Sequence, residues 1–487
     1  MVEALQKKLS DSGLARWTAL IIVSLTMMFG YFITDIMAPL EDLLTTNGEV
    51  VYYSDGSFAK VENGQTVQVV PNKTVENKLQ GAGWSSTEYG NFTGAYGWFN
   101  VFLFMLLIGG LILDKKGVRF TGRMSSLLML AGALLKFFAV SPFFPFHGMF
   151  LGMHVQVWIA GLGFAVFGVG CEITGITVSK VITKWFTGHG LALAMGLQVA
   201  LARLGTACAL GFSLPIAKHF GHLSWPVFFG CIALTVGFLF YLVFCVMDSK
   251  LDRQIASSKE ADEEDKFHLN DVKFILVNRG FWLISILCLL FYSGVFPFLK
   301  FATKLMIYKY NVAPSLAGLI PSVLPFGTIF LTPLFGIIYD RLGKGATLMI
   351  IGSVMLVAVH VLFALPILNY WWFALIIMVV LGIAFSLVPS AMWPSVPKII
   401  PQKQLGSAYS LIFYIQNIGL MCVPMLIGWI IDTFAKHVGP NNVVTYNYSI
   451  PMVIFALFGT MAVFVAIYLK SVDKKNHYGL EQANIKK

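Results

Sequence analysis

The sequence has little charge for its length. Of its 487 residues only 12% are charged, whereas 57% are hydrophobic. A soluble protein carries about 25% charged residues, because charge is what covers its surface. Apolar runs of about 20 residues recur from one end of the chain to the other, and each is long enough to cross a bilayer. The low charge excludes a soluble protein, and the recurrence of the runs excludes a soluble domain with one anchor.

The sequence also lacks the motifs of catalysis, metal binding and disulfide scaffolds. All six cysteines lie within apolar runs, so no disulfide framework is predicted. No HExxH sequence, nucleophile elbow, Walker loop or Cys/His cluster occurs. The net charge of +10 comes from lysines and arginines that flank the apolar runs. We therefore expect no enzyme, no cofactor and no metal, and the basic residues indicate a membrane partner, not a nucleic acid.

Twelve candidate membrane spans follow from the apolar runs, which predicts an all-α membrane protein. The spans cover roughly 17–40, 88–113, 119–141, 155–182, 189–217, 225–247, 280–307, 315–338, 345–366, 371–397, 404–432 and 448–469. A charged linker divides them six and six. The predicted parts are an N-terminal segment 1–16, a bundle 17–247 with a long loop 42–87, the linker 248–279, a bundle 280–469 and a tail 470–487.

The distribution of lysine and arginine predicts the orientation of the chain. These residues gather in the loop 115–123, in the linker 248–279 and in the tail 470–487, whereas the loop 42–87 is net acidic. The positive-inside rule then places both termini in the cytoplasm. In the loop 42–87, β-forming residues alternate with Gly, Asn and Asp, which favours a small hairpin, with an irregular excursion as the alternative.

A repeated motif links the two halves. "GGLILDKKGVR" follows the second span and "FGIIYDRLGKG" follows the eighth, and both read Gly-x-x-x-Asp-(Lys/Arg)-x-Gly. Glycine lets helices approach closely, a turn glycine allows a short loop, and Asp beside basic groups can latch one conformation. We therefore expect a conformational role for these residues and for Asp35 in the first span: Gly110, Asp114, Gly117, Arg119, Gly336, Asp340, Arg341 and Gly343.

These two copies resemble the signature loop of the major facilitator superfamily. The resemblance implies that superfamily's fold of twelve helices in two six-helix halves. It also implies a substrate site near the midplane, between the halves.

Two charges lie deep inside predicted spans. Glu172 interrupts the glycine-rich run "FAVFGVGCEITGITVSKVI", and Arg203 lies midway along the next span. Each charge costs roughly 2.5–3.5 kcal/mol at such a depth unless it has a partner or a wet cavity. One interpretation is a structural ion pair between the two. The other is a substrate site, in which Glu172 binds a cationic group and the planar guanidinium of Arg203 binds a carboxylate.

Other polar and aromatic residues within the spans are weaker candidates. Lys136, Lys300 and Lys304 are predicted to lie at the membrane interface. Several aromatic residues and one amide are candidates for the cavity, with simple packing as the alternative. They are Tyr96, Trp98, Tyr292, Phe296, Trp393 and Gln416.

A narrower resemblance rests on longer stretches. "FGVGCEITGITVSKVITKWFTGHGLALAMGLQVALARLG", "MWPSVPKIIPQKQLGSAYSLIFYIQNIGL", "FYSGVFPFLKF" and "FGYFITD" are similar to the family of major facilitator superfamily domain-containing protein 1, lysosomal dipeptide transporters. The resemblance implies uniport of dipeptides with a preference for cationic side chains. It also implies that Glu172 meets the dipeptide's amino terminus and Arg203 its carboxylate. That family works with an accessory subunit, and nothing in this sequence indicates a surface for one.

The leading hypothesis is a dipeptide uniporter that works by alternating access. The ExxE(R/K) pattern of proton-coupled peptide carriers is absent from the first span. The alternative is a proton-coupled or exchange carrier of small organic anions, and a membrane sensor or scaffold is a further alternative. The first 17 residues contain no acidic dileucine signal, which favours a bacterial inner membrane over a lysosome. The expected partners are a dipeptide and the lipid bilayer.

Overall fold

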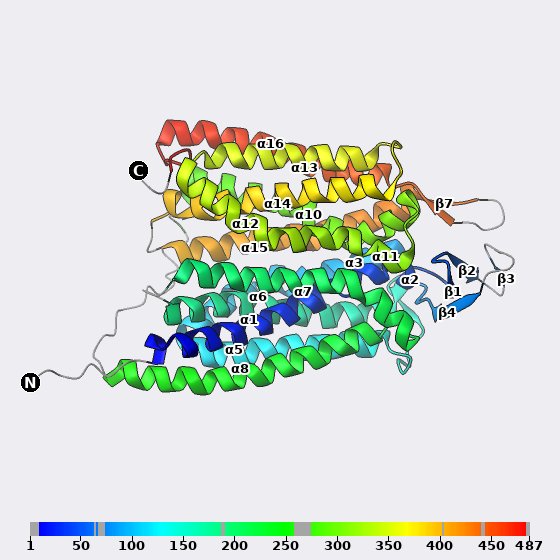
Figure 1. The fold of residues 1–487 in the computed structure, drawn as a ribbon, viewed down its shortest axis with the longest axis horizontal. Coiled ribbons are helices and arrows are strands. Elements are labelled where there is room, and N and C mark those ends of the chain that lie inside the picture. Colours follow the sequence, from blue (N-terminus) through cyan, green and yellow to red (C-terminus); the bar gives the residue numbers. More distant parts are fainter. Residues whose placement is uncertain are drawn as a thin grey trace, which may run out of the picture.

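The computed structural model describes residues 9–62, 65–66, 74–186, 190–257, 273, 275–401, 404–439 and 444–483. Half of the linker predicted at 248–279 lies outside these residues. Long helices run roughly parallel to one axis, as the ribbon in Figure 1 shows. The described part of the chain begins and ends at one end of the bundle, here called the linker end, and the small strands lie at the other, here called the sheet end.

The chain crosses the bundle twelve times, as predicted. The first half consists of α1 (Gly13–Asp35), a second crossing made of α3 (Ser86–Gly94), η3 (Ala95–Gly97), α4 (Trp98–Phe102) and the start of α5 (Met105–Val140), and then α6 (Val155–Phe186), α7 (Leu191–Phe220) and α8 (Trp225–Ser257). The second half consists of α10 (Arg279–Tyr310), α12 (Leu319–Leu342), α13 (Gly345–Ala364), α14 (Trp371–Ile399), α15 (Leu405–Ile430) and α16 (Ser449–Asn476).

The second crossing differs from the single helix expected at 88–113. Phe104 has a left-handed backbone (φ 53°), which breaks the helical hydrogen-bond ladder between α4 and α5. Further along, α5 contains a turn at Gly117 (φ 73°, ψ 175°), so its two parts belong to the second and third crossings. For this reason only eleven continuous helices of the described residues are long and apolar enough to span a membrane.

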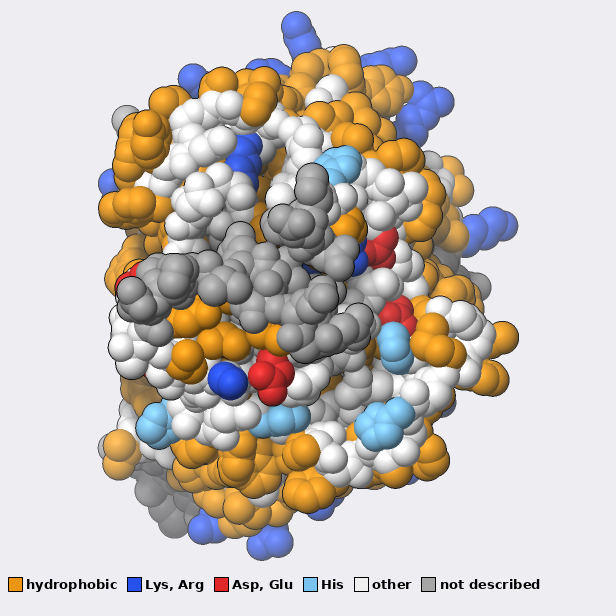
Figure 2. Space-filling model, turned by 90° about the vertical axis from the view of Figure 1, so that its right-hand side faces the viewer, with side chains coloured by type: hydrophobic (Ala, Val, Ile, Leu, Met, Phe, Trp, Pro, Cys, Tyr) orange, Lys and Arg blue, Asp and Glu red, His pale blue; other side chains and the backbone are white. Residues whose placement is uncertain are grey.

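The loop after the first span folds into a small sheet, which confirms the predicted hairpin and extends it. Strands β1 (Glu49–Tyr53) and β2 (Phe58–Glu62) pair antiparallel. Adding β3 (Gln65–Thr66) and β4 (Val75–Gln80) gives the order β3-β2-β1-β4. A second pair, β7 (Lys436–Val438) and β8 (Val444–Tyr446), lies at the same end. Seen from this end, charged and histidine side chains lie inside a rim of hydrophobic ones (Figure 2).

Glycines bring the two halves into close contact at the sheet end. Gly90 and Gly94 of α3 lie directly against the backbone of α15, where an added Cβ would collide with the carbonyls of Pro424 and Met421. On the opposite side of the bundle, Gly318 of the second half lies against the carbonyl of Leu210 in α7. Only glycine allows backbones to approach this closely. The halves are therefore closed on each other at the sheet end.

The linker end of the same helices is open. A Cβ added at Gly110 in α5 or at Gly406 in α15 would meet nothing within 4 Å. The same holds for Gly196 in α7 and Gly336 in α12. The close approach expected for Gly110 and Gly336 is therefore not made in this conformation. The structure therefore shows one of the two conformations that those glycines allow, the one that is open at the linker end.

Candidate functional site: a cavity between the two halves

A cavity of about 570 Å³ lies between the two halves. Its walls come from α1, η3, α5, α6 and α7 of the first half and from α15 of the second. Residues from the middle of the bundle to the linker end line it: Met27, Tyr31, Tyr96, Leu107, Gly110, Leu111, Leu113, Asp114, Cys171, Glu172, Gly175, Ile176, Ser179, Gln198, Val199, Ala202, Arg203, Gly406, Ser407, Tyr409, Ser410 and Phe413. The cavity therefore reaches from the midplane toward the linker end. Such a volume is typical of small-molecule sites.

Glu172 lies near the middle of α6 and lines this cavity. The hydroxyl of Tyr96 donates a hydrogen bond to its Oε1 atom at 2.9 Å. Gly168, one turn earlier on α6, lets the backbone of Tyr96 pack directly against that helix. Since an isolated buried charge is costly, the Tyr96 hydroxyl offsets part of the cost and orients the carboxylate.

Arg203 lines the same cavity from α7, and its guanidinium lies among aromatic rings. Its Cζ atom is 5.0 Å from the ring centroid of Phe385, 5.2 Å from that of Phe296 and 5.7 Å from that of Tyr31. Cation–π attraction partly compensates for lost hydration. Within the described part of the chain, Arg203 makes no hydrogen bond or ion pair. Its donors are therefore available to an anion.

The structural ion pair considered from the sequence is not formed. Glu172 and Arg203 share one cavity, but no described nitrogen–oxygen contact within 4.0 Å joins them. Each has its own local support, a tyrosine hydroxyl for the acid and three rings for the base. The arrangement presents one negative and one positive group, separately, to the same space.

Four of the remaining cavity candidates divide into two pairs. Phe296 and Gln416 line a second, smaller cavity of about 80 Å³ on the sheet-end side of Glu172. Tyr292 and Trp393 hydrogen bond to each other, with the indole N–H donating to the hydroxyl at 3.0 Å. Each packs against a ring of the site. Tyr292 contacts Phe385, which lies against the Arg203 guanidinium, and Trp393 stacks on Phe413, which lines the main cavity.

Trp98 does not reach either cavity, which corrects its assignment as a cavity residue. Its ring packs against Trp158, with centroids 6.0 Å apart, and near Gly161 of α6. The cause is helical geometry. Two residues along a helix correspond to a rotation of about 200°, so a chain that points Tyr96 inward points Trp98 away.

Asp35 forms an ion pair that joins the halves on the sheet-end side of the cavities. Nζ of Lys300 lies 2.6 Å from its Oδ1 atom, and the hydroxyl of Thr206 donates to Oδ2 at 2.9 Å. Lys300 also donates to the carbonyl of Thr34 at 2.7 Å. Asp35 belongs to α1 and Lys300 to α10, so the pair closes the path between the cavity and the sheet end.

The predicted interface lysines are instead buried. Lys136 is fully buried and donates to the carbonyl of Ile33 at 2.9 Å, so its prediction as a snorkelling residue was wrong. Lys304 is also fully buried, 3.7 Å from Glu41, and donates to the hydroxyl of Thr45 at 2.7 Å. The sequence pattern placed these lysines near helix ends correctly. It did not reveal their partners, all of which lie more than a hundred residues away in the sequence.

The sheet also contributes to the closed end. Lys60 of β2 pairs with Asp42 at 2.8 Å, and the hydroxyl of Tyr308 on α10 donates to the same carboxylate at 2.8 Å. Across the two halves, Asp432 accepts hydrogen bonds from the backbone N–H groups of Ser86 and Thr87. These two donors are otherwise unsatisfied groups at the start of α3.

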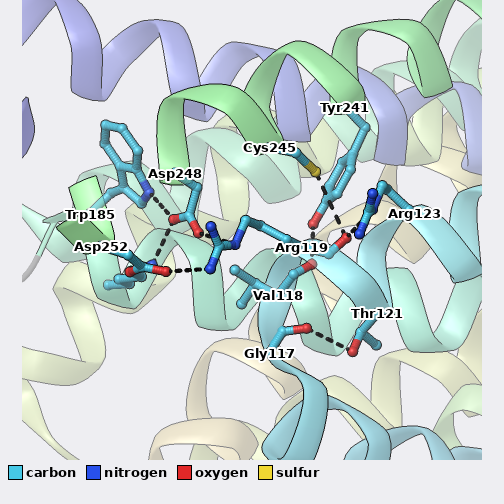
Figure 3. Close-up of polar contacts among 11 residues, drawn as sticks. Gly117, Val118, Arg119, Thr121, Arg123, Trp185, Tyr241, Cys245, Asp248 and Asp252 are labelled. Carbon is cyan, nitrogen blue, oxygen red and sulfur yellow. Dashed lines mark hydrogen bonds and ion pairs between the residues drawn. The ribbon is translucent and has the colours of Figure 1, made fainter. Parts of the chain in front are cut away.

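The first copy of the repeated motif forms a network of charges at the linker end (Figure 3). Asp114 lies 3.2 Å from Lys180 of α6 and also lines the main cavity. Arg119 lies 2.9 Å from Asp252 and 3.7 Å from Asp248, both on α8. Gly117 supplies the left-handed turn between them. All these contacts stay within the first half.

The second copy has different neighbours. Gly343 is a turn glycine (φ 69°) that packs against the backbone of residues 481–483. Asp340 is half-buried and Arg341 is exposed. In the tail, the Glu481 carboxylate accepts from both the backbone N–H and the hydroxyl of Thr347, at 2.9 and 2.8 Å. The tail therefore caps the start of α13, a contact that no pattern in the sequence indicated.

Comparison with known proteins identifies a family and several relatives that share one name. The family model of the Major Facilitator Superfamily matches residues 20–424 and 301–484. The lysosomal dipeptide transporter MFSD1 of Danio rerio is 30% identical over 360 residues, which cover 69% of this chain and 71% of the relative. The Bos taurus protein of the same name is 29% identical over 349 residues, 69% of this chain and 70% of the relative.

Solved structures share the fold. A bacterial homologue of the human lysosomal transporter Spinster, in an inward-facing and unoccupied conformation, superposes with a TM-score of 0.65 at 14% identity. The match covers 96% of this chain and 99% of that one. At this identity the similarity concerns the arrangement of the helices.

Proposed function

Because the chain belongs to the major facilitator superfamily, and is therefore a multi-pass membrane transporter and not an enzyme, we propose that it carries dipeptides by alternating access. The dipeptide's ammonium group binds Glu172 and its carboxylate binds Arg203. The relatives named as dipeptide transporters support this substrate class. The observation that carries the proposal is the unpaired guanidinium of Arg203 in the same cavity as the half-buried carboxylate of Glu172.

The cavity's charges favour a dipeptide over a simple organic anion. In an organic-anion carrier Arg203 would clamp the anion and Glu172 would serve only as a proton site, so the substrate itself would leave the carboxylate that Tyr96 orients without a partner. A zwitterion satisfies both groups at once, with charge-assisted hydrogen bonds at each end. Among the charged residues that line the cavity, two are acidic (Asp114 and Glu172) and one is basic. A cationic side chain that reaches Asp114 would share that carboxylate with Lys180, which lies 3.2 Å from it, and this contact is the support for a preference for cationic dipeptides.

Alternating access follows from the glycines at the two ends. At the sheet end, α3 contacts α15 through Gly90 and Gly94. At the linker end, α5 and α15 are separated at Gly110 and Gly406. Rocking the halves about the midplane exchanges the two contacts and exposes the cavity at the sheet end. Asp35–Lys300 breaks in that movement, because its residues belong to different halves.

We also propose that the protein is a uniporter of a bacterial inner membrane and that its linker end faces the cytoplasm. The lysines and arginines at the linker end support the orientation. In this orientation the cavity described above faces the cytoplasm. Transport then needs no coupling ion, and the direction of flux follows the dipeptide gradient.

The experiment is dipeptide uptake by proteoliposomes of the purified full-length chain. We expect counterflow of radiolabelled lysyl-alanine that does not change when a proton gradient is imposed or collapsed. Arg203→Lys keeps the charge but not the planar fork, so uptake should fall while the protein stays folded. Lys475→Gln, an exposed residue of α16, is the matched control and should leave uptake unchanged. Uptake of dicarboxylates without dipeptide uptake would refute the proposal and support the anion carrier.

A further inference from the structure

A third cavity, of about 660 Å³, lies on the flank of the first half, away from the substrate site. It is a groove between the start of the third crossing in α5 and the linker end of α8. Ten residues line it: Lys116, Arg119, Phe120, Arg123, Leu242, Cys245, Val246, Ser249, Lys250 and Arg253. The fully buried Tyr241, which precedes Leu242 on α8, packs directly against Gly122 of α5, and its hydroxyl donates to the carbonyl of Val118 at 2.9 Å.

The groove concentrates positive charge without matching negative charge. Five of its ten residues are cationic and none is acidic. Arg119 is paired with Asp252 outside the groove wall. Within the described ranges, Lys116, Lys250 and Arg253 have no carboxylate within ion-pair distance. The side chain of Arg123 is held in place by a hydrogen bond from Nε to the carbonyl of Arg119 at 3.1 Å, as Figure 3 shows.

The rest of the groove is apolar and faces outward. Phe120 is 43% exposed and Val246 is 58% exposed. Leu242 and Cys245 complete this wall. On a membrane helix, exposed apolar side chains of this kind face lipid. The groove is thus cationic where α8 approaches its end at Ser257 and apolar one to two turns earlier, toward the bilayer.

We propose that this groove binds an anionic phospholipid, with the phosphate held by Lys116, Arg123, Lys250 and Arg253 and the acyl chains lying along Phe120 and Val246. Basic pockets between membrane helices are suited to anionic head groups. A soluble phosphate fits the cations but leaves the apolar wall uncovered. A zwitterionic lipid covers the wall but does not neutralise the cations.

The site adjoins the repeated motif, which gives the lipid a way to influence transport. Arg119 lines the groove and also pairs with Asp252, while Asp114 lies five residues earlier and lines the substrate cavity. A phosphate in the groove competes with Asp252 for Arg119. The lipid therefore acts on the same network that the proposed rocking movement rearranges, although its binding does not depend on the identity of the transported substrate.

The test compares lipid binding by two matched pairs of substitutions in the purified full-length chain. The first is Lys250→Gln/Arg253→Gln in the groove. The second is Lys474→Gln/Lys475→Gln, which removes two exposed cations at the linker end of α16. Binding of phosphatidylglycerol is measured by native mass spectrometry from detergent, with phosphatidylcholine as the neutral lipid. Inorganic phosphate and glycerol 3-phosphate are added as competitors.

Each cation near an anionic lipid contributes about fivefold in affinity, so the groove pair should weaken phosphatidylglycerol binding about 25-fold. Phosphatidylcholine binding should not change, and the pair on α16 should have little effect. An equal loss in both pairs would mean diffuse surface attraction and would overturn the proposal. Displacement of the lipid by millimolar inorganic phosphate would also overturn it, in favour of a soluble anion. Thermal unfolding in the neutral lipid checks that both variants are folded.

Discussion

The ion pair between Asp35 and Lys300 gives the sharpest prediction about how the transporter moves. The two charged atoms lie 2.6 Å apart, and their side chains are only 10% and 12% exposed. Removing one partner of a buried pair leaves the other charge uncompensated, at a cost of about 3–5 kcal/mol. When the sheet end opens, water reaches the remaining charge and most of that cost disappears. The substitution therefore destabilises the conformation seen here relative to the one open at the sheet end.

A shift of about 3 kcal/mol changes the ratio of two conformations by more than a hundredfold. We expect Lys300→Met and Asp35→Asn each to raise the population that is open at the sheet end. Because the cost of either substitution is the uncompensated charge that it leaves, the double variant has no such charge and should shift the ratio less than either single variant. The control is Thr206→Val, which removes the one hydrogen bond that this hydroxyl donates to the Asp35 carboxylate but leaves both charges in place, so it should shift the ratio less than either charge substitution.

The assay is labelling of a reporter cysteine by an impermeant thiol reagent added from the sheet end. Leu420→Cys is suitable because Leu420 lines the small cavity that the ion pair covers. Cys208, Cys245 and Cys422 are not buried and are first replaced by alanine. Labelling should rise at least tenfold in both charge variants. Unchanged labelling, with the variants folded, would refute the view that this pair holds the sheet end closed.

Three further predictions concern other parts of the structure. Gly94→Leu should hold the sheet end open and Gly406→Leu the linker end open, since each side chain blocks one of the two contacts between halves; cysteine labelling from both sides would show opposite shifts. Tyr96→Phe removes the hydrogen bond to Glu172 and should weaken dipeptide binding about tenfold by calorimetry, without affecting folding. Glu481→Gln weakens the cap of α13 and should lower the free energy of unfolding by about 1 kcal/mol, measured by thermal denaturation, with no change in substrate affinity.

Much of the fold was predictable because it depends on local patterns. Hydropathy located the helices to within several residues, and the copies at Asp114 and Asp340 indicated the two halves and the superfamily, which the family model confirms. The resemblance to the lysosomal dipeptide transporter family is also confirmed by relatives at 27–30% identity. The break at Phe104 was missed, because a left-handed phenylalanine leaves no mark in a hydropathy profile.

The site was predictable in part. Glu172 and Arg203 stood out from the sequence because isolated charges in apolar runs need a reason, and the structure places both on one cavity. Their roles in binding stay predictions. The rings of Tyr31 and Phe385 around Arg203 were missed, since aromatic residues are abundant and only the packing of α1 and α14 selects these two. Lys300 was predicted to lie at the membrane interface, and its ion pair with Asp35 was missed because the two residues are 265 positions apart in the sequence.

The central claim is that Arg203 binds the dipeptide's carboxylate and Glu172 its ammonium group. The most direct measurement is calorimetric binding of lysyl-alanine, its C-terminal amide and its N-acetyl derivative to the wild type, Arg203→Ala and Glu172→Gln. A charge-assisted hydrogen bond contributes about 1.5–3 kcal/mol, so each substitution should cost roughly 10- to 100-fold for the unmodified dipeptide. The account predicts that Arg203→Ala costs nothing further for the amide and Glu172→Gln nothing further for the N-acetyl derivative. Equal losses for all three ligands, or tight binding of the N-acetyl derivative by the wild type, would contradict it.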